Sequence, residues 1–352
     1  MNPVLVEVLR GDHVESMHAG ALAIIDADGA VHTALGDVDR PIFPRSAVKA
    51  LQALPLLESG AAERLALTDA ELAIACASHS GEPEHVATSA GMLRKLGLDM
   101  GALECGTQWP SREPVLRGML ARGEQATPLH NNCSGKHAGF VCVACQLALA
   151  QGSDPAGFAR GYVAPDHPVM REVGDALATM TGTDLARAPQ GIDGCSIPTF
   201  GLPLRALALA FARLGSGHGL APQRAQAARR LRSAVAAATF MVGGTQRFDT
   251  LVMQALGERL FCKIGAEGVY CAALPELGLG VALKIDDGTA RGAEAAMAAV
   301  AEGLLPLDQR SEAARLLRGY SEMPLHNWRG IHVGDVRASS TLRSAVSTRP
   351  RP

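Results

Sequence analysis

The sequence predicts an α+β fold, in which strands near both ends of the chain form one antiparallel sheet packed beside a helical subdomain. Short apolar runs of β-type residues lie within the first 40 residues and again after residue 260. The segment between them, about 61–238, is rich in Ala, Leu and Arg with helical periodicity. The order of strands, then helices, then strands is typical of an α+β architecture.

The N-terminal strands are predicted from two apolar runs, Ala21–Ile25 and Val31–Leu35. The residues between them, Asp26–Gly29, contain the Asp and Gly that suit a hairpin turn. A helix is expected over Pro44–Gly60, because the fixed φ of proline suits the first position of a helix. Pro55 should kink or shorten this helix.

The C-terminal strands are predicted from three short β-type runs. These runs are Leu260–Ile264, Gly268–Ala273 and Gly280–Ile285. An Ala-rich helix is expected to follow over Arg291–Leu304.

The domain organisation expected from this order is one unit made of two subdomains, over residues 1–340. The sheet subdomain would contain residues from about 1–60 and 240–335, and the helical subdomain those from about 61–239. Residues 341–352 are rich in Ser, Thr, Arg and Pro, and are expected to form a flexible tail.

The composition is that of an ordinary globular protein, since 352 residues with 47% hydrophobic side chains can bury a large core. The net charge is −2 and the arginines form no sustained basic stripe, so nucleic acid is not an expected partner. No stretch approaches the roughly 20 apolar residues that cross a bilayer, and no signal-peptide pattern is visible. We expect a cytoplasmic protein with no membrane partner, whose eight cysteines remain thiols.

Lysine is rare in this chain, which carries 33 basic residues. Only five of them are lysines, namely Lys49, Lys95, Lys136, Lys263 and Lys284. Arginine keeps its proton in proteins, whereas a buried lysine can become neutral and act as base, nucleophile or ligand. Lys49, Lys136 and Lys263 lie in clusters of Ser, Cys and Gly, and are therefore the candidates for chemistry. Lys95 and Lys284 are interpreted as surface residues.

A Ser-x-x-Lys motif, Ser46 to Lys49, lies at the start of the first expected helix. Residues three apart share a helical face, so the Lys49 amine could reach the Ser46 hydroxyl and take its proton. A second element, Lys263-Ile264-Gly265, lies on a late strand. The order of a Ser-x-x-Lys followed by a Lys-x-Gly resembles serine β-lactamases and penicillin-binding proteins.

Two further segments are dense in polar side chains. The first, Cys76–Glu82 with the sequence CASHSGE, could equally be a polar loop or part of a site. The second, Asn131–His137, places Cys133 and Lys136 three residues apart, and Cys195 follows an Asp-Gly pair later in the chain. Thiolates suit zinc, but two cysteines fall short of four ligands, so the spacing by itself favours ordinary buried cysteines over a metal site.

Taken together, these motifs resemble the Rhizobium etli type of the L-asparaginase II family over about residues 3–335. The motifs that carry the resemblance are FPRSAVKALQ (Phe43–Gln52), CASHSGE (Cys76–Glu82), NNCSGKHAG (Asn131–Gly139), DGC (Asp193–Cys195) and KIGAEG (Lys263–Gly268). The resemblance implies a fold similar to serine β-lactamases, penicillin-binding proteins and glutaminases. It also implies a homodimer that hydrolyses the side-chain amide of L-asparagine to L-aspartate and ammonia.

The resemblance implies the site residues as well. It makes Ser46 and Lys49 a nucleophile dyad, and Ser78 and Lys263 a second, adjacent Ser-Lys pair. It implies a zinc ion held by Cys133, Lys136 and Cys195, with water as fourth ligand and with Asp193 and His137 as neighbours. The residues expected to bind substrate are Arg45, His79, Asn131, Gly265 and Glu267.

The expected mechanism starts with attack of Ser46 on the amide carbon while Lys49 accepts its proton. Backbone N–H groups near Ser46 and Gly265 would stabilise the oxyanion, and Ser78 and Lys263 would relay a proton to the leaving ammonia. Zinc is expected to position substrate or stiffen the site rather than to generate hydroxide. Two alternatives stay open: a glutaminase or other small-amide hydrolase on the same scaffold, because one methylene discriminates weakly, and a non-catalytic zinc-binding relative.

Overall fold

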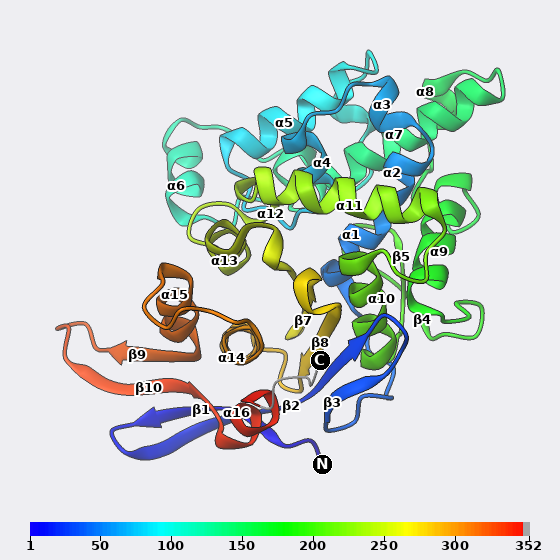
Figure 1. Cartoon of the computed structure of the whole chain (residues 1–352). Coiled ribbons are helices and arrows are strands. Elements are labelled where there is room, and N and C mark those ends of the chain that lie inside the picture. Colours follow the sequence, from blue (N-terminus) through cyan, green and yellow to red (C-terminus); the bar gives the residue numbers. More distant parts are fainter. Residues whose placement is uncertain (348–352) are drawn as a thin grey trace. The chain divides into compact units, whose positions relative to one another are not determined.

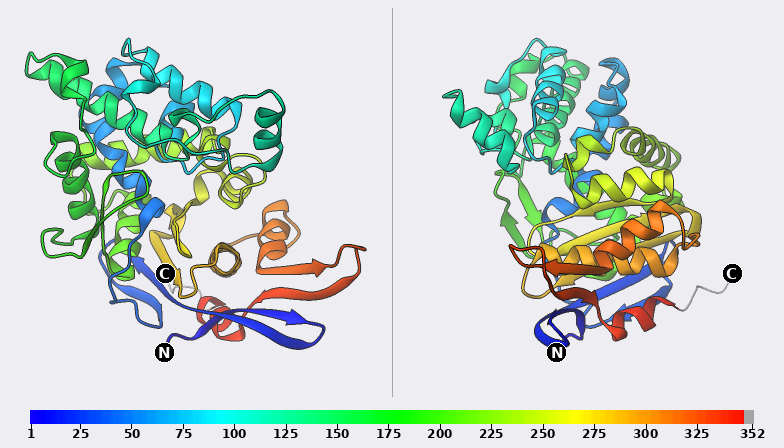
Figure 2. Two further views of the ribbon diagram at one scale, coloured as in Figure 1. Left: turned by 180° about the vertical axis from the view of Figure 1, so that it is seen from behind. Right: turned by 90° about the vertical axis from the view of Figure 1, so that its left-hand side faces the viewer.

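The computed structural model describes residues 1–347 and divides into two compact units. The sheet unit consists of Met1–Ala47, Leu202–Ser216 and the chain from Cys262 onward. The helical unit consists of Val48–Gly201 and Gly217–Phe261. Figures 1 and 2 show that the strands of the sheet unit come from the two ends of the chain, drawn in blue and in yellow to red.

Eight strands form the sheet, in the order β6-β7-β8-β2-β1-β10-β9, and β3 lies beside β2. They are β1 (Val4–Arg10), β2 (His13–Asp26), β3 (Val31–Leu35), β6 (Phe261–Ile264), β7 (Val269–Leu274), β8 (Leu279–Ile285), β9 (Glu322–His326) and β10 (His332–Ala338). The long strand β2 pairs antiparallel with β1 through its first half and with β8 and β3 through its second half. Strands from both ends of the chain therefore join in one antiparallel sheet, as predicted.

Four helices belong to the sheet unit. They are α10 (Leu204–Ser216), α14 (Ala290–Leu304), α15 (Glu312–Ser321) and α16 (Ser340–Ser347). Helix α10 packs on β8, β7 and β2, and α14 packs on α15, α16 and the strands. The approach of α10 to β8 is very close, because a Cβ atom at Gly280 would lie 1.9 Å from Ala208 O and 2.3 Å from Ala212 N. Glycine is the residue that permits such a backbone contact.

The helical unit is built around α7 (Ser134–Ala150), which is buried on nearly every side. A helix that is apolar all round belongs in the interior of its unit. Its neighbours include α2, α4, α5, α8 and α9. The other elements of the unit are α1 (Lys49–Gln52), α2 (Leu54–Glu58), α3 (Ala61–Arg64), α4 (Asp69–Ala75), α5 (Pro83–Arg94), α6 (Glu113–Ala121), α8 (Pro155–Phe158), α9 (Pro168–Thr181), β4 (Gln190–Ile192), β5 (Pro198–Phe200), α11 (Pro222–Ala237), α12 (Phe240–Gly243) and α13 (Phe248–Leu256).

The strands and the helix predicted near the C-terminus are confirmed to within one residue at most ends, as β6, β7, β8 and α14. The predicted hairpin is confirmed as β2 and β3, with β2 longer than expected. The prediction of a single helix over Pro44–Gly60 is wrong. It consists of a 3₁₀ turn, η1 (Arg45–Val48), followed by α1 and α2, and Pro55 lies at the start of α2.

The units differ from the expected subdomains at their boundaries. The sheet unit ends at Ala47 rather than near residue 60 and resumes at Cys262 rather than near 240. It also includes Leu202–Ser216, which the sequence placed in the helical subdomain, because α10 packs on the sheet. The expected flexible tail is corrected over its first residues, which form α16, while 348–352 lie outside the described residues.

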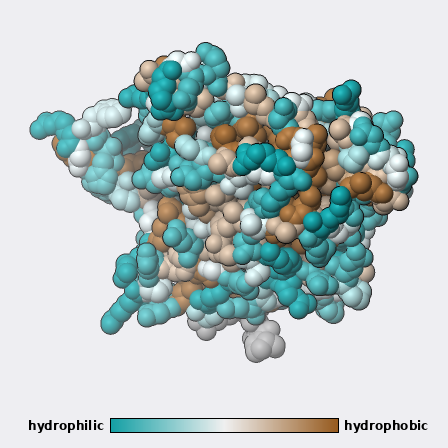
Figure 3. All heavy atoms as spheres, turned by 90° about the horizontal axis from the view of Figure 1, so that it is seen from above, coloured by the Kyte–Doolittle hydropathy of each residue, from teal (hydrophilic) through white to brown (hydrophobic). Residues whose placement is uncertain are grey.

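The surface seen from above Figure 1 mixes hydrophilic side chains with smaller hydrophobic areas (Figure 3). Large hydrophobic residues are exposed singly, for example Ile192 at the end of β4, which is 81% exposed, and Trp328 in the turn between β9 and β10. Scattered exposure of this kind is ordinary for a globular protein. Within residues 1–347, no helix is both long enough and apolar enough to span a membrane.

Replacing Gly280 by Ala should destabilise the sheet unit, because the new methyl group would collide with the backbone of α10. We expect a loss of about 1–3 kcal/mol in the free energy of unfolding, the usual effect of overpacking. The measurement is urea unfolding followed by circular dichroism. The control is Gly319→Ala in α15, where a Cβ atom meets nothing within 4 Å and should not destabilise. Equal midpoints for Gly280→Ala and the unmodified protein would contradict this account.

Candidate functional site

The side chain of Lys49 lies at the centre of a buried polar cluster and is itself only 1% exposed. Its Nζ is 3.1 Å from Ser78 Oγ and also donates to the carbonyl oxygens of Ala77 and Asn132. The two carbonyls can only accept hydrogen bonds, whereas the serine hydroxyl can accept or donate. A neutral Lys49 amine would therefore donate to the carbonyls and accept from Ser78, which is the geometry of a base beside a hydroxyl.

The packing of α4 against α7 brings these groups together. A capping box of Thr68 and Glu71 starts α4, which ends just before the segment that carries Ser78. At the start of α7, a Cβ atom on Gly135 would lie 2.3 Å from Ile74 O. Glycine thus lets the N-terminus of α7 approach the C-terminal turn of α4. That approach brings the carbonyls of both segments within reach of one amine.

The four expected catalytic residues are divided between the units. Lys49 and Ser78 lie in the helical unit, and Ser46 and Lys263 lie in the sheet unit. The structure thus joins Lys49 to Ser78, while the pairing of Lys49 with Ser46 and that of Ser78 with Lys263 stay predictions. Lys263 is fully buried on β6 and donates to Ile264 O at 2.8 Å.

The strand that carries Lys263 packs directly on the segment that carries Ser46. A Cβ atom on Gly265 would lie 2.5 Å from Pro44 O and 3.2 Å from Ala47 Cβ. The backbone N–H of Gly265 donates to Val269 O at 2.8 Å, so it belongs to the turn between β6 and β7. The Gly265 N–H is thus engaged within the protein, and the expected oxyanion role of N–H groups near Ser46 and Gly265 stays a prediction. Arg45, beside Ser46, has a φ of 51°, which is uncommon for a residue other than glycine.

The three expected zinc ligands converge in the helical unit. Cys133 is the N-cap residue of α7, Lys136 lies on its first turn, and Cys195 lies in the loop between β4 and β5. Lys136 Nζ donates to Cys195 Sγ at 3.0 Å, and the Cys133 and Cys195 thiols are in hydrogen-bond contact. All three side chains are buried. Two sulfur atoms and one amine nitrogen thus form one compact donor set.

The electrostatics of this cluster favour one thiolate. The hydrogen bond from Cys195 lowers the pKa of Cys133 well below its usual value, and the positive charges of Lys136 and Lys49 lower it further. The same hydrogen bond and burial raise the pKa of Cys195. Burial opposes the charge of Lys136, but the nearby Cys133 and Cys195 raise its pKa overall. Without a metal ion, these shifts favour a thiolate at Cys133 beside a thiol at Cys195 and an ammonium group at Lys136.

A zinc ion fits this donor set, because soft thiolates and a nitrogen are the ligands that zinc prefers. Among the described residues, no group of three or more His, Cys, Asp or Glu side chains is placed to hold a metal ion. A site at this position therefore needs Lys136 as its third protein ligand. Asp193 acts on Lys136 through its negative charge, which agrees with its expected place near the cluster.

The residues expected to bind substrate are partly committed to the protein itself. Asn131 donates to the carbonyls of Cys105 and Gly106 and accepts from the backbone N–H of Cys133. His79 is buried, with Nε2 2.9 Å from Ser134 Oγ and Nδ1 accepting from a backbone N–H. Both residues brace the segments around the site. Glu267 is exposed in the turn after β6, and its substrate role stays a prediction.

His137 does not contact the thiol cluster through a hydrogen bond of its ring. Its Nδ1 is 2.6 Å from Tyr162 Oη, which accepts from the backbone N–H of Glu104. Burial lowers the pKa of His137 well below its usual value, and the charges of Lys136 and Lys49 lower it further. His137 is therefore neutral. Its expected influence on zinc stays a prediction.

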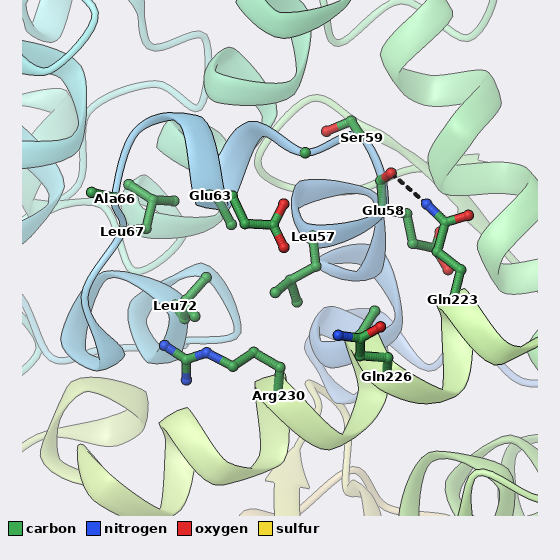
Figure 4. A pocket seen from close by; sticks show the side chains of 13 residues that line it. Leu57, Glu58, Ser59, Glu63, Ala66, Leu67, Leu72, Gln223, Gln226 and Arg230 are labelled. Carbon is green, nitrogen blue, oxygen red and sulfur yellow. Dashed lines mark hydrogen bonds between the residues drawn. The ribbon is translucent and has the colours of Figure 1, made fainter.

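A separate cavity of about 570 Å³ lies between α2, α3 and α11 (Figure 4). Glu63 points into it, but the other charged groups are engaged with the protein. Glu58 is paired with Arg224 and accepts from Gln223 through its backbone, and Arg230 is paired with an aspartate. The cavity lining contains no lysine, histidine or cysteine. Its chemistry therefore does not suggest a catalytic centre.

A family model for L-asparaginase II matches residues 6–338. The chain belongs to the L-asparaginase II family. Membership of this family indicates an asparaginase-type amidohydrolase, while the narrower Rhizobium etli type stays a prediction. The search of curated proteins found no match. Solved structures similar to this chain include a β-lactamase from Mycobacterium bovis, with 14% identity, a TM-score of 0.38, and coverage of 78% of this chain and 89% of that chain.

Sequence reasoning missed a polar contact between Glu82 and Thr245 near the segment that carries Ser78 in this asparaginase-family chain. Glu82 belonged to a recognised motif, but Thr245 belonged to none. The two are hydrogen bonded although 163 residues separate them in the chain. The signal that could have found Thr245 is the pair of glycines before it, Gly243 and Gly244, which indicates a close backbone approach.

His79 should remain neutral throughout the pH range in which the protein is folded. Burial lowers its pKa well below 6.5, and the charges of His85 and Lys49 lower it further. Because the folded-state pKa is depressed, the stability that neutral His79 contributes is fully present above about pH 6.5 and is lost as pH falls below it. The measurement is the ¹⁵N NMR signal of the imidazole between pH 5 and 8. A titration with a midpoint near 6.5 would contradict the burial argument.

Proposed function

We propose that the protein is an L-asparagine amidohydrolase, which releases L-aspartate and ammonia by a Ser-Lys mechanism. Two findings support the proposal: membership of the L-asparaginase II family, and the buried Lys49 amine hydrogen bonded to Ser78. The second carries the mechanistic part. Among residues 1–347, Lys49 is hydrogen bonded to carbonyl oxygens and a hydroxyl rather than to a carboxylate. A lysine buried among such groups suits proton transfer.

In the proposed reaction, Ser46 Oγ attacks the amide carbon of the substrate and its proton passes to Lys49. The amide C–N bond then breaks, and Ser78 delivers the proton from Lys49 to the leaving nitrogen. The hydrogen bond between Lys49 and Ser78 supports this relay, since both atoms are already within transfer distance. Water then hydrolyses the acyl-enzyme by the same groups in reverse order. Lys263 would favour a neutral Lys49 by its own positive charge.

The proposed cofactor is zinc, held by Cys133, Lys136 and Cys195. When bound, zinc would supply Lewis acidity and a rigid anchor beside the Lys49 cluster. The contact between the Cys133 thiol and Lys49 supports a positioning role for zinc, because a metal ligand and the proposed base are then in direct contact. We therefore propose that zinc positions the substrate and that the serine carries out the attack.

The test of the function is ammonia release by the purified protein with L-asparagine, L-glutamine and D-asparagine side by side. We expect turnover of L-asparagine that is abolished in Ser46→Ala and nearly abolished in Lys49→Arg, because arginine cannot accept a proton. Mass spectrometry of the quenched reaction would detect an acyl group on Ser46. Near-normal turnover by Lys49→Arg would refute the base assignment. Preference for L-glutamine would move the substrate to the glutaminase alternative, and no turnover of any amide would refute the function.

The test of the metal site is the zinc content of the purified protein together with kinetics after chelation. We expect one zinc ion per chain, and we expect Cys195→Ser to lose it. After chelation, KM should rise while kcat changes little, because positioning acts mainly on substrate binding. A fall in kcat at unchanged KM would show that zinc takes part in the chemistry instead.

A further inference from the structure

A buried carboxylate, that of Glu82, lies four residues after Ser78 and joins two loops. The side chain of Glu82 is 5% exposed. Its Oε1 accepts from Ser80 Oγ at 2.7 Å and from the Thr245 N–H at 2.8 Å, and its Oε2 accepts from Thr245 Oγ1 at 2.6 Å. Arg112 Nε lies 3.7 Å from Oε2. All of these groups belong to the helical unit.

The two loops joined by Glu82 are those that hold the backbone of Ser78. The Ser78 N–H donates to Val242 O, and the Ser80 N–H donates to Gly243 O, both at 3.0 Å. Residues 78–80 therefore lie beside the end of α12, and the Ser78 side chain lies 3.1 Å from Lys49 Nζ. The Glu82 carboxylate connects these two segments a second time, by accepting hydrogen bonds from Thr245. A shift of either loop would move the Ser78 hydroxyl.

The space for the carboxylate depends on a missing side chain. Gly244 has a φ of 107°, and a Cβ atom there would lie 2.2 Å from Ser80 Oγ and 2.4 Å from Glu82 Oε1. Glycine thus lets the backbone of the second loop touch the Glu82–Ser80 hydrogen bond. The carboxylate is enclosed on this side by main chain, which leaves it little freedom to move.

His85, three residues after Glu82, strengthens the connection between the two loops. The backbone N–H of Glu82 donates to His85 Nδ1, and His85 Nε2 donates to Phe240 O. The His85 ring stacks on Phe240 and on His79, with 4.8 Å between ring centroids in each case. The Glu82 segment therefore holds the loop after residue 239 by its side chain and by its backbone.

The ionised state of Glu82 fixes the direction of the hydrogen bonds that it receives. Burial raises the pKa of Glu82, but the hydrogen bonds from Thr245 and Ser80 and the charge of Arg112 lower it below its ordinary value. An ionised carboxylate only accepts hydrogen bonds, so the hydroxyls of Ser80 and Thr245 must both point at it. A buried network in which every member is satisfied specifies one arrangement of its loops.

We propose that Glu82 is a positioning residue, which holds Ser78 Oγ within proton-transfer distance of Lys49 Nζ. The inference deepens the proposed hydrolysis and rests on it. Ser78 is only partly buried, so its own packing does not fix the position of its hydroxyl. The 3.1 Å hydrogen bond between Ser78 and Lys49 therefore depends on the loops that Glu82 holds. A displacement of about 1 Å at such a contact lowers rates by on the order of 100-fold.

The experiment compares four variants of the full-length protein. Glu82→Ala should lower kcat for L-asparagine by on the order of 100-fold with little change in KM, because substrate binding does not need the relay. Glu82→Gln should recover most of kcat. Its amide can accept from Ser80 and from the Thr245 N–H, and can donate to the Thr245 hydroxyl after that hydroxyl rotates.

The matched control is Glu71→Ala. Glu71 is buried to the same degree, and its carboxylate accepts from the Thr68 N–H and hydroxyl and pairs with Lys95. Its loss should reduce stability in urea unfolding while kcat per folded molecule stays normal. Thr245→Val is the milder variant should Glu82→Ala not fold. It removes one donor to Glu82 and should lower kcat with the fold retained.

Three results would overturn the inference while the proposed hydrolysis stands. The first is normal kcat in folded Glu82→Ala or in Thr245→Val. The second is an equal loss of kcat in Glu71→Ala and Glu82→Ala, which would make the effect one of general stability. Failure of Glu82→Gln to recover activity while Glu82→Ala stays inactive would likewise count against a role through hydrogen-bond geometry.

Should the unmodified protein release no ammonia from L-asparagine, the proposed function fails and a second readout decides the inference. The chain has five lysines, so ¹³C-lysine labelling gives few NMR signals, and Lys49→Met assigns the Lys49 Cε resonance. We expect this resonance to move in Glu82→Ala and to stay in place in Glu71→Ala. An unmoved resonance in Glu82→Ala would overturn the positioning role independently of turnover.

Discussion

The burial of the Lys49 amine is the constraint on which the helical unit depends. Removing an amine from water costs free energy unless its hydrogens find acceptors. Two carbonyl acceptors, from Ala77 and Asn132, and the Ser78 hydroxyl lie within hydrogen-bond distance, and they come from two segments far apart in the chain. The fold therefore has to bring the end of α4 and the start of α7 to one point. The glycine at 135 makes this approach possible.

The same meeting of segments connects Lys49, the proposed base, to the thiol cluster. Asn132, whose carbonyl accepts from Lys49, directly precedes Cys133, and the Cys133 thiol is in hydrogen-bond contact with Lys49. Asn131 braces this turn from behind by accepting from the Cys133 N–H. Lys49 and the proposed metal ligand Cys133 are therefore held by the same turn, residues 131–133. A change at the thiols should be transmitted to the Lys49 amine without passing through substrate.

How much of this could be predicted from the sequence depended on the range of the interactions. The strands β6, β7 and β8 and the helix α14 were predicted because their hydrophobic periodicity is local. The edge strand β9 was missed because its side chains alternate between exposed and half-buried, which leaves little apolar signal. Helix α10 was placed in the wrong subdomain because its pattern shows an apolar face but does not show which surface covers it.

The candidate site shows the same limit. Spacing placed Ser46 and Lys49 on neighbouring turns, and the resemblance supplied Cys133, Lys136 and Cys195, whose convergence the structure shows. The hydrogen bond from Lys49 to Ser78 spans 29 residues, so no local pattern could indicate it. Long-range polar contacts leave only weak traces in one sequence, because Ser, Thr and Glu are also common on surfaces.

The two units solve the problem of close packing in different ways. In the sheet unit, α10 meets β8 through bare backbone at Gly280, a contact that needs shape alone. In the helical unit, glycines at 135 and 244 let backbone approach polar groups, and the buried hydrogen bonds then fix the arrangement. Apolar contacts tolerate small shifts, whereas a buried hydrogen bond is lost by them. A loop that must hold a hydroxyl at a fixed distance from an amine is therefore better held by a satisfied polar network, such as that around Glu82, than by apolar packing.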